Sequence, residues 1–571
     1  MSAGVSWGVT RALVVATSSF LALTWSAASF AQTAPSRTLP QTIAPTVQEA
    51  QGEIALPATR LTAAPAGAEA LSVRVDRVVV EGIGPDRAEA VAALTRPVEG
   101  RTVTVAALYE VAAKIEALYA QDGRILTRAT LPPQSLKDGA TLRIVVVEGF
   151  IESIDDSRVP AKVREPIRDR LVKLINRPGL SLPQIERQVL LAARVPGVNL
   201  RTTLVPGELV GGARLVLQVE HDAVAGGLGA DNSLSSAYDD WNLEARLTAN
   251  SVFGAGEQFY AFGASATDLA LTGGHPHRRI VGLGMIAPLG FDGATAQLEY
   301  LHADTNPIAP RGVLPVQGQF DRIVAKLSSP LILGRREMLS VSGGFEWTNE
   351  SQAARGFGVD LSKDALRSFT LGLEGGKAIG AATTVSSRID FNQGISGFGA
   401  RTPADARISG TPLSRQGSKP DFTKLTATAS VDRTLGGPFS ARLVLRGQTG
   451  FGGALPSAMQ FSLDGGEGVS GFDAGSINVD SGLTGRVELA AQAPIGGRVV
   501  ARPYLFAAAG RGWLEKPTVV EKPRPDGWSV GGGARTTLAE RVNLSAELAH
   551  ANSNLFAKNQ TRLTASVNVA F

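Results

Sequence analysis

The sequence predicts a transmembrane β-barrel of about 16 antiparallel strands, preceded by two small α+β domains. From about residue 223 to the end, apolar and polar residues alternate in strand after strand, without a helical pattern between them. Between residues 72 and 222, strand patterns and helix patterns follow one another instead. The first residues have the features of a secretory signal, so we expect the chain to leave the cytoplasm.

Residues 1–31 are the predicted signal peptide. Arg11 supplies a small positive region, residues 12–25 form an apolar stretch, and the small residues Ser29 and Ala31 fit cleavage after Ala31. After this segment the sequence has no apolar run of about 18 residues or more, so it predicts no membrane-spanning helix.

Residues 32–71 are rich in proline, alanine, threonine and glutamine, and they carry few large apolar side chains. This composition is typical of a linker. Thr46 and Glu49 have the spacing of a capping box, which predicts one short helix there. The sequence leaves open whether a helix in this region plugs the barrel.

Residues 72–150 predict the first α+β domain. Its clearest helix runs from a cap at Thr104 to a stop at Gly123, with apolar side chains along one face. The other expected elements are a strand that ends at Gly82, a helix at about 86–95, and strands at 124–131 and 140–149.

Residues 151–222 repeat this theme less clearly. The expected elements are helices at about 161–176 and 183–195, and strands at 198–205 and 213–221. Two small α+β units in tandem are more typical of binding adaptors than of one catalytic core.

Residues 223–571 predict the barrel. In residues 241–249, Trp241 and every second residue after it are apolar, while the residues between them are polar or charged. The same alternation recurs at 425–432 and 486–489. A soluble sandwich has about seven to nine strands in roughly 100 residues, whereas this pattern fills a much longer region. We therefore expect apolar side chains toward lipid and polar ones toward a lumen. The low aromatic content of 6% is an objection, because the rims of membrane barrels usually carry aromatic side chains.

One stretch has the spacing of a nucleotide-binding loop. Residues 466–471 read G-x-G-x-x-G, but no helix pattern follows Gly471, so a glycine-rich loop is favoured. The sequence has no cysteine, and His275 and His277 lack a third ligand nearby, so a solvated turn is favoured over a metal site. The net charge of +4 is small and no basic block occurs, which gives no support to nucleic-acid binding. The sequence therefore predicts no cofactor.

Four segments together resemble a known family. They are residues 131–149, residues 185–219, the pair Asp231-Asn232 and the turn 254–257. In this order and spacing, the chain resembles the two-partner secretion transporters of the haemolysin and haemagglutinin type, within the outer-membrane assembly superfamily. The resemblance implies polypeptide-transport-associated (POTRA) domains in the periplasm, at 72–150 and 151–222, and an outer-membrane barrel at 223–571.

The resemblance also gives the glycine-rich loop a role. In the family this loop folds back into the barrel, and the arginine of its Val-Arg-Gly-Phe/Tyr tip pairs with the aspartate of a Phe-x-Asp-x-Gly motif on the wall. The tip motif aligns here with Val469, Ser470, Gly471 and Phe472, and the wall motif aligns with Phe506, Ala508 and Gly510. Both charged residues of the pair are absent, at Ser470 and at Ala508. The sequence leaves two possibilities open: a loop that is not clamped, or a loop held by a hydrogen bond from Ser470 to the wall.

The function implied by the resemblance is export of a secreted partner protein from the periplasm to the cell surface. The POTRA domains would bind the unfolded cargo by strand addition, and the barrel would conduct it. The C-terminal residue, Phe571, would be the signal for the barrel-assembly machinery, and outer-membrane lipids would surround the barrel. The expected lumen residues, each interpreted as an ordinary solvated side chain, are Arg442, Arg446, Arg486, Glu488 and Glu547.

Three alternatives belong to other functional classes. A factor that inserts other barrels is disfavoured because only two POTRA-like units are expected, and a diffusion porin is disfavoured by the lumenal loop. An enzyme would need a catalytic set, and His550 has no serine motif around it. The sequence identifies neither the cargo nor the oligomeric state.

Overall fold

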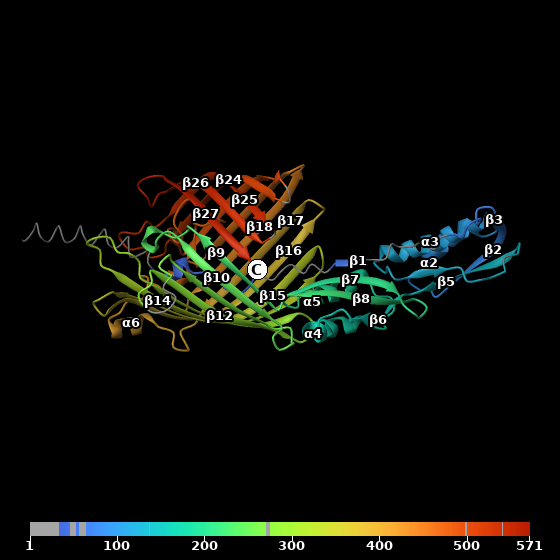
Figure 1. Ribbon diagram of the computed structural model, residues 1–571, viewed down its shortest axis with the longest axis horizontal. Coiled ribbons are helices and arrows are strands. Elements are labelled where there is room, and N and C mark those ends of the chain that lie inside the picture. The colour runs from blue at the N-terminus through green and yellow to red at the C-terminus, as the bar shows by residue number, and fades with distance from the viewer. Residues whose placement is uncertain are drawn as a thin grey trace, which may run out of the picture.

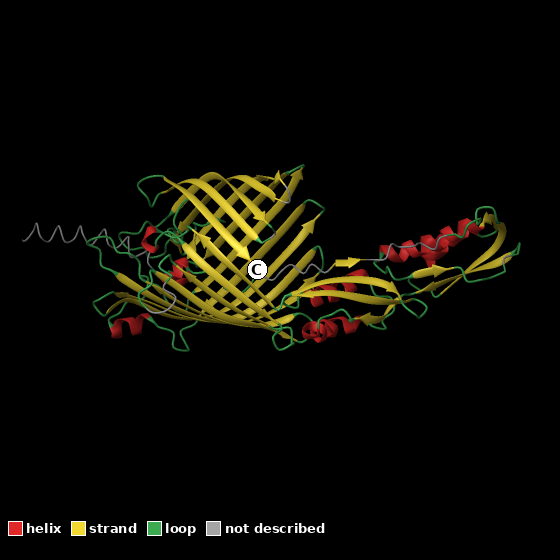
Figure 2. Cartoon of the chain, in the orientation of Figure 1, coloured by secondary structure: helices red, strands yellow, loops and turns green. Residues whose placement is uncertain are grey.

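The computed structural model describes residues 34–45, 53–55, 64–135, 137–269, 274–496, 499–539 and 541–571. The predicted signal peptide at 1–31 and the predicted short helix at Thr46 to Glu49 lie outside these ranges. The described chain is elongated, with a barrel at one end and two small α+β units in a row beyond it (Figure 1). Most of the helices belong to these two units, whereas tilted strands build the barrel (Figure 2). Among the described residues, no helix has both the length and the hydropathy that crossing a membrane requires.

The first unit, farthest from the barrel, has a sheet in the order β3-β2-β5-β4. Leu108 and Ile115 of its long helix pack against Leu142 and Ile144 of the sheet, and all four side chains are fully buried. The long helix begins where predicted, because the Thr104 hydroxyl accepts a hydrogen bond from the Ala107 amide at 3.2 Å. The elements are β2 (Ser72–Glu81), α2 (Ala88–Thr95), η2 (Arg96–Val98), β3 (Arg101–Thr104), α3 (Val105–Gln121), β4 (Arg128–Thr130) and β5 (Ala140–Val147).

Two expectations for this unit need correction. The strand predicted at 124–131 shortens to β4, because the Arg124 amide donates to the Tyr119 carbonyl and the chain turns off the end of α3. Strand β3 was not expected at all. Its four residues lie between η2 and α3, and they are too few to produce an alternating pattern.

The second unit has a sheet in the order β1-β7-β8-β6. Its helices lie close to their expected positions and bury Ile167, Leu171 and Leu191 completely. Strand β1 comes from the predicted linker and lies parallel to β7, with Glu53 opposite Arg201 and Ala55 opposite Thr203. The elements are β1 (Glu53–Ala55), β6 (Phe150–Asp155), α4 (Ala161–Leu171), η3 (Val172–Leu174), α5 (Leu182–Ala193), β7 (Val198–Pro206) and β8 (Gly212–His221).

The second unit is docked on the short turns at one end of the barrel. The turn at 254–257 is tight, with positive φ at both glycines, and the Glu257 carboxylate accepts hydrogen bonds from the amides of Phe253 and Ala255. Lys162 of α4 donates to the Val252 carbonyl beside this turn at 2.7 Å. Leu190 and Leu191 of α5 form an apolar cluster with Leu333 at the end of a barrel strand. The POTRA-like region therefore has a packed joint with the barrel.

The barrel is closed and antiparallel and has 16 strands within the described residues, when β22 and β23 are counted as one because both pair with β24. The predicted number of strands is thus confirmed. The strands are β9 (Val224–Asp231), β10 (Asn242–Asn250), β11 (Gln258–Ser265), β12 (Arg278–Leu289), β13 (Ala294–Thr305), β14 (Val316–Leu333), β15 (Glu337–Ala354), β16 (Val359–Ile379), β17 (Thr383–Gly394), β18 (Thr423–Gly436), β19 (Phe439–Thr449), β22 (Ser481–Ala491), β23 (Ala493–Gly496), β24 (Val499–Trp513), β25 (Asp526–Leu538), β26 (Val542–Ser553) and β27 (Gln560–Ala570).

The alternation places side chains as predicted. On β22, Val487 and Leu489 point outward and are about half exposed, while Arg486 and Glu488 between them point inward and are buried. The tryptophans are concentrated at one rim, whereas exposed phenylalanines lie at the other rim, at Phe253, Phe291, Phe439 and Phe571. Tyr300 and all four tryptophans of the described chain lie on the outer wall, toward the end of the barrel that is opposite the two α+β units; the tryptophans are Trp241, Trp347, Trp513 and Trp528. The low aromatic content is therefore compatible with an aromatic girdle.

The linker prediction for residues 32–71 is wrong for part of this region. Residues 34–45, called the lumenal segment below, lie inside the barrel and include η1 (Pro35–Thr38). The Ile43 side chain is buried against Tyr260, Ile280 and Leu301 of the inner wall. A segment that is bound mainly through its main chain and lacks apolar periodicity has no sequence signal that distinguishes it from a linker. This explains why the linker prediction is wrong here.

Candidate lumenal site

The long connection between β19 and β22 also lies inside the barrel. Residues 450–480, called the lumenal loop below, contain η5 (Ser457–Met459) and a small hairpin of β20 (Phe461–Ser462) with β21 (Asn478–Val479). No helix begins at Gly471, so the nucleotide-loop interpretation fails, as expected. The loop has an apolar cluster of its own, which packs on Ala551 of β26; its members are Phe461, Leu463, Val469, Phe472, Ile477 and Val479.

The four residues of the tip motif face the wall. Val469 is fully buried in the loop cluster, and its amide donates to the Leu463 carbonyl at 2.9 Å. Gly471 has a φ of 97°, and a Cβ at this position would lie 2.9 Å from the Cβ of Ala551. Only glycine allows this close approach of the loop to the wall. Phe472 is 8% exposed and stacks on Phe556, with 5.2 Å between the ring centroids.

The three residues of the wall motif lie on β24, directly behind the tip. Phe506 and Ala508 are buried and point into the lumen. A Cβ at Gly510 would lie 3.4 Å from a methyl group of Val469, so this glycine also touches the tip. The structure therefore brings the tip motif and the wall motif together.

Ser470 makes the polar contact between the tip and the wall. Its hydroxyl accepts a hydrogen bond from Nη1 of Arg486 on β22 at 3.0 Å. Arg486 is the cross-strand neighbour of Ala508 and has only 1% of its side chain exposed. Its guanidinium carbon lies 3.8 Å from the centroid of the Phe506 ring. The sequence left open whether the loop is unclamped or is held by a hydrogen bond between Ser470 and the wall. In the structure this hydrogen bond is present.

Arg486 belongs to a network of charged side chains on the inner wall. It donates to Glu488 at 2.9 Å and to Glu547 at 2.6 Å. Arg535 donates twice to Glu488, at 2.8 and 3.0 Å, and Tyr504 donates to Glu547 at 2.8 Å. The expectation that Arg486, Glu488 and Glu547 are ordinary solvated residues is therefore wrong for Arg486, which is enclosed by the loop and by its partners, and for Glu488, which is buried between two arginines.

Two further expected lumen residues also contact the loop. Arg442 of β19 forms an ion pair with Glu467 at 3.0 Å, and both side chains are substantially exposed. The Arg446 guanidinium lies over the Phe461 ring, 5.2 Å from its centroid. The sequence placed these residues in the lumen but gave no indication that they contact one loop, with which Arg415 and Arg562 also form ion pairs, at Asp480 and Asp473.

Phe571 lies where the barrel closes. Its amide and carbonyl exchange hydrogen bonds with Gly226 of β9 at 3.0 and 2.9 Å. Strands β27 and β9 pair over only five residues, from Ser566 opposite Asp231 to Ala570 opposite Gly227. Beyond this ladder the Asn232 carboxamide bonds to the main chain of β27, accepting from the Ala565 amide at 2.7 Å and donating to the Leu563 carbonyl.

The histidine pair at 275 and 277 lies in the connection between β11 and β12. His275 is exposed, and Nδ1 of His277 lies 2.6 Å from a carboxylate oxygen of Asp239. Within the described residues, no group of three or more His, Asp or Glu side chains is arranged to hold a metal ion.

Comparison with known proteins assigns the chain to a family. The family model for the haemolysin secretion/activation protein ShlB/FhaC/HecB matches residues 211–535, and the model for the ShlB-type POTRA domain matches residues 73–149. The chain belongs to the haemolysin secretion/activation family. It is a two-partner secretion transporter, in which a barrel preceded by POTRA domains exports a partner protein. This assignment favours export over the assembly-factor and porin alternatives.

Individual relatives agree with this assignment. The heme/hemopexin transporter protein HuxB of Haemophilus influenzae (strain 86-028NP) is 24% identical over 420 residues, which cover 72% of this chain and 71% of HuxB. The structure of CdiB from Escherichia coli has the same fold, with a TM-score of 0.68 at 21% identity and full coverage of both chains. BamA from Haemophilus ducreyi, lacking POTRA domains 1–3, is less similar, with a TM-score of 0.51 at 12% identity over 88% of this chain and all of that chain.

Proposed function

We propose that this transporter lies in the outer membrane with both α+β units in the periplasm, and that the second unit captures unfolded cargo on the edge of β7 that β1 occupies. On this proposal residues 151–222 are a second POTRA domain. The observation that carries the proposal is strand β1, which already adds to that edge as a parallel strand. Main-chain hydrogen bonds recognise an extended peptide whatever its side chains are, so the same edge suits an unfolded chain of varied sequence.

The occupant of the β7 edge and the lumenal segment are parts of one stretch of chain. Residues 34–45 lie inside the barrel and residues 53–55 lie on β7, with only residues 46–52 between them. A cargo strand that takes the place of β1 would therefore release the tether of the lumenal segment. Capture of cargo and clearance of the lumen would then be one event, and the transport itself would need no catalytic site.

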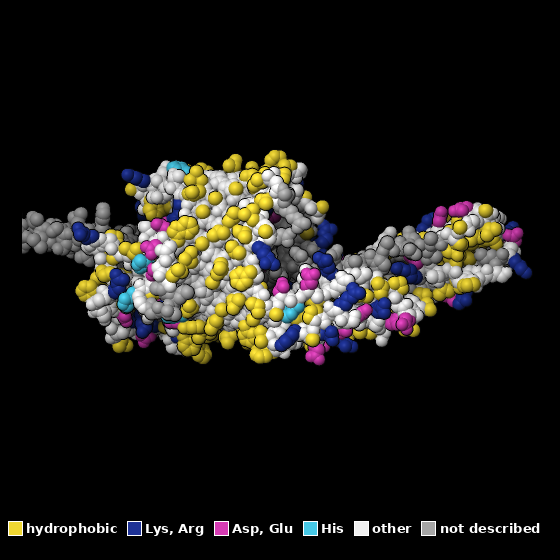
Figure 3. Space-filling view, viewed as in Figure 1, with side chains coloured by type: hydrophobic (Ala, Val, Ile, Leu, Met, Phe, Trp, Pro, Cys, Tyr) yellow, Lys and Arg dark blue, Asp and Glu magenta, His cyan; other side chains and the backbone are white. Residues whose placement is uncertain are grey.

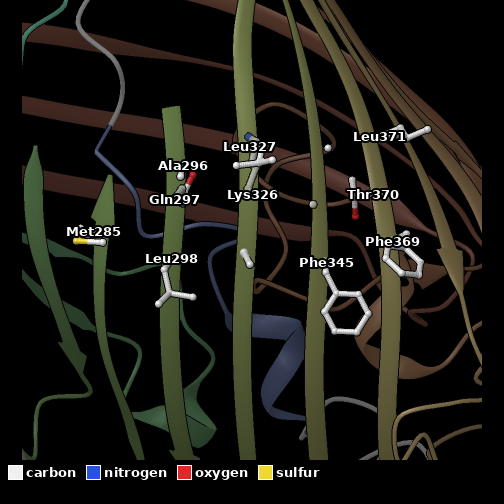
Figure 4. A pocket seen from close by; sticks show the side chains of 13 residues that line it. Met285, Ala296, Gln297, Leu298, Lys326, Leu327, Phe345, Phe369, Thr370 and Leu371 are labelled. Carbon is white, nitrogen blue, oxygen red and sulfur yellow. The ribbon is translucent and has the colours of Figure 1, made fainter. Parts of the chain in front are cut away.

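The outer wall supports the proposed location in a membrane. Apolar side chains cover the barrel, whereas charged side chains are more frequent on the two α+β units (Figure 3). A groove of about 520 Å³ on this wall is lined almost entirely by apolar groups (Figure 4). Such a surface suits the acyl chains of outer-membrane lipids. The side chains around the groove include Met285, Leu298, Leu327, Phe345, Phe369 and Leu371.

A disulfide that fixes β1 on β7 tests the capture site. The chain has no cysteine of its own, and Glu53 and Arg201 are register partners. Neighbouring strands lie about 4.8 Å apart, within the Cα separation that a disulfide spans. The double variant E53C/R201C should secrete its partner protein only when a reductant is present. The R201C variant alone is the control. Equal secretion with the disulfide formed would exclude the β7 edge as the capture site.

The barrel-assembly machinery is the second proposed partner, and Phe571 is its proposed signal. Deletion of Phe571 removes both hydrogen bonds to Gly226 at the seam. We expect the deletion to lower the amount of barrel in the outer membrane without changing delivery of the chain to the periplasm. The measurement is the heat-modifiable fraction on a gel, and a normal amount of this fraction would contradict the proposal.

A further inference from the structure

The charge arrangement around the lumenal loop is the reverse of the one that the aligned motifs imply. The motif places a cation on the loop, at position 470, and an anion on the wall, at position 508. Here the loop has a hydroxyl at 470, the wall has a methyl group at 508, and a cation stands on the wall at Arg486. Arg486 is the most completely buried arginine of the described chain and the largest of its fully buried side chains.

The charges in this site balance without the loop. Arg486 and Arg535 face Glu488 and Glu547, so two cations meet two anions. A third carboxylate at 508 would leave a surplus negative charge beside a network that is already neutral. A cation at 470 would point at the guanidinium of Arg486, because the Ser470 hydroxyl lies 3.0 Å from its Nη1. Neutral residues at positions 470 and 508 are therefore the ones that keep the charge of this network balanced.

The Phe506 ring explains why the cation is held at this place. The Arg486 guanidinium lies over the ring face at 3.8 Å, and Nε, Nη1 and Nη2 each have a partner in the plane. Planar stacking combined with in-plane donors is specific to arginine, because the lysine ammonium has neither the plane nor the fork of donors. One of these donors goes to the loop, and the other two go to the wall.

We propose that Arg486 is a positioning residue for the tip of the lumenal loop, with the charge of the clamp transposed from the loop tip to the wall. It fixes the tip through Ser470, while Glu488, Glu547 and Phe506 hold the guanidinium in place. This inference concerns the position of the loop and holds whether or not the β7 edge captures cargo, since none of its measurements involves cargo.

The test exchanges the two residues in the full-length protein. The variants are R486S, S470R and the transposed double variant S470R/R486S, each purified as heat-modifiable barrel in detergent. The measurement is amide hydrogen exchange of residues 465–475, with the paired strands β25 and β26 as the internal reference. The Ala474 amide donates to the Ser233 carbonyl, which lies outside the loop, at 3.2 Å, so its exchange reports release of the loop from its surroundings.

We expect exchange of the loop to be faster by about tenfold or more in both single variants, because each leaves charge unbalanced in an enclosed site. The double variant should return to within about threefold of the unmodified protein, because a cation from the loop then meets Glu488 and Glu547. Exchange in the double variant as fast as in R486S would overturn the proposal. Unchanged exchange in R486S would also overturn it.

Two milder variants keep the test decisive if R486S fails to fold. S470A removes only the acceptor on the loop and should speed exchange at residues 469–472 by a factor of about three to ten. R486K keeps the charge but loses the planar fork, and should behave like S470A or worse. The matched control is R442A, because Arg442 also joins the wall to this loop, through Glu467, but in an exposed pair. Loop exchange that is the same in S470A and R486K as in the unmodified protein, or that rises as much in R442A as in S470A, would contradict the special role of Arg486.

Discussion

Two parts of the chain occupy one lumen, and different contacts hold them there. The lumenal segment is bound mainly through its main chain, to charged side chains of the wall: Arg278 donates to the Thr38 carbonyl at 2.7 Å, and the Ile43 amide donates to Glu299 at 3.3 Å. The lumenal loop has an apolar cluster of its own and packs on the wall through it. A segment bound through its main chain is released when a few hydrogen bonds break, whereas a loop with its own core moves only as a unit.

The largest expected effect lies in the loop. Phe472→Ala removes a buried ring that stacks on Phe556, and a phenylalanine truncation in a core costs about 3–5 kcal/mol. Loop exchange should rise far more than in S470A, which loses one hydrogen bond worth about 0.5–1.5 kcal/mol if neutral. The control is Phe451→Ala, because this ring of the same loop is exposed. If F472A and F451A raised loop exchange equally, the apolar cluster would not be what holds the lumenal loop in place.

A smaller effect is expected at Ile43, the largest buried apolar side chain of the lumenal segment. Ile43 is 2% exposed, and its terminal methyl lies over Gly282, where a Cβ would be only 2.3 Å away. Ile43→Ala should cost about 2 kcal/mol, the low end for such truncations, because the segment can readjust in an open lumen. The released segment should raise the ion conductance of the barrel in a planar bilayer. Ile308→Ala, at an exposed isoleucine in the connection between β13 and β14, serves as the control.

The smallest effect tests the polar contacts of the segment. The Thr42 hydroxyl donates to Glu299 at 3.1 Å and accepts from the Ala44 amide at 3.1 Å. Thr42→Ala should cost about 1 kcal/mol and raise the conductance less than Ile43→Ala, while Thr42→Ser keeps the hydroxyl and should be near neutral. A larger effect of T42A than of I43A would reverse the order and show that one side-chain bond, rather than the Ile43 side chain, retains the segment.

The sequence predicted the barrel well because a period of two is a local property. Val487 and Leu489 face outward and Arg486 and Glu488 face inward, as their alternation requires. The alternation places a residue in the lumen but does not say which lumen residues meet. Glu547 lies 61 positions from Arg486, and their contact depends on the order and tilt of several strands. The neutral residues at positions 470 and 508, together with an inward-facing arginine on the preceding strand, were the available signal for this contact.

The lumenal segment was beyond the reach of sequence patterns for a different reason. Its hydrogen bonds use amides and carbonyls that every residue has, so Ala34 to Ala44 read as an ordinary proline- and alanine-rich linker. The same holds for β1, whose pairing with β7 is a main-chain contact. Side-chain patterns reveal packing against a core, but they carry little information about main-chain binding.

The positions of the tryptophans have a consequence for spectroscopy. Residues 32–240 contain no tryptophan, so both α+β units are silent when emission is excited at the red edge of indole absorption. Once the predicted signal peptide is removed, the fluorescent tryptophans of the chain are Trp241, Trp347, Trp513 and Trp528. All four lie on the outer wall near one rim. A blue shift of the tryptophan emission therefore shows when that rim enters the lipid bilayer. Lipids with acyl chains brominated at a known depth would quench the four tryptophans as one population. Refolding of the barrel can thus be followed in the intact protein without any added label.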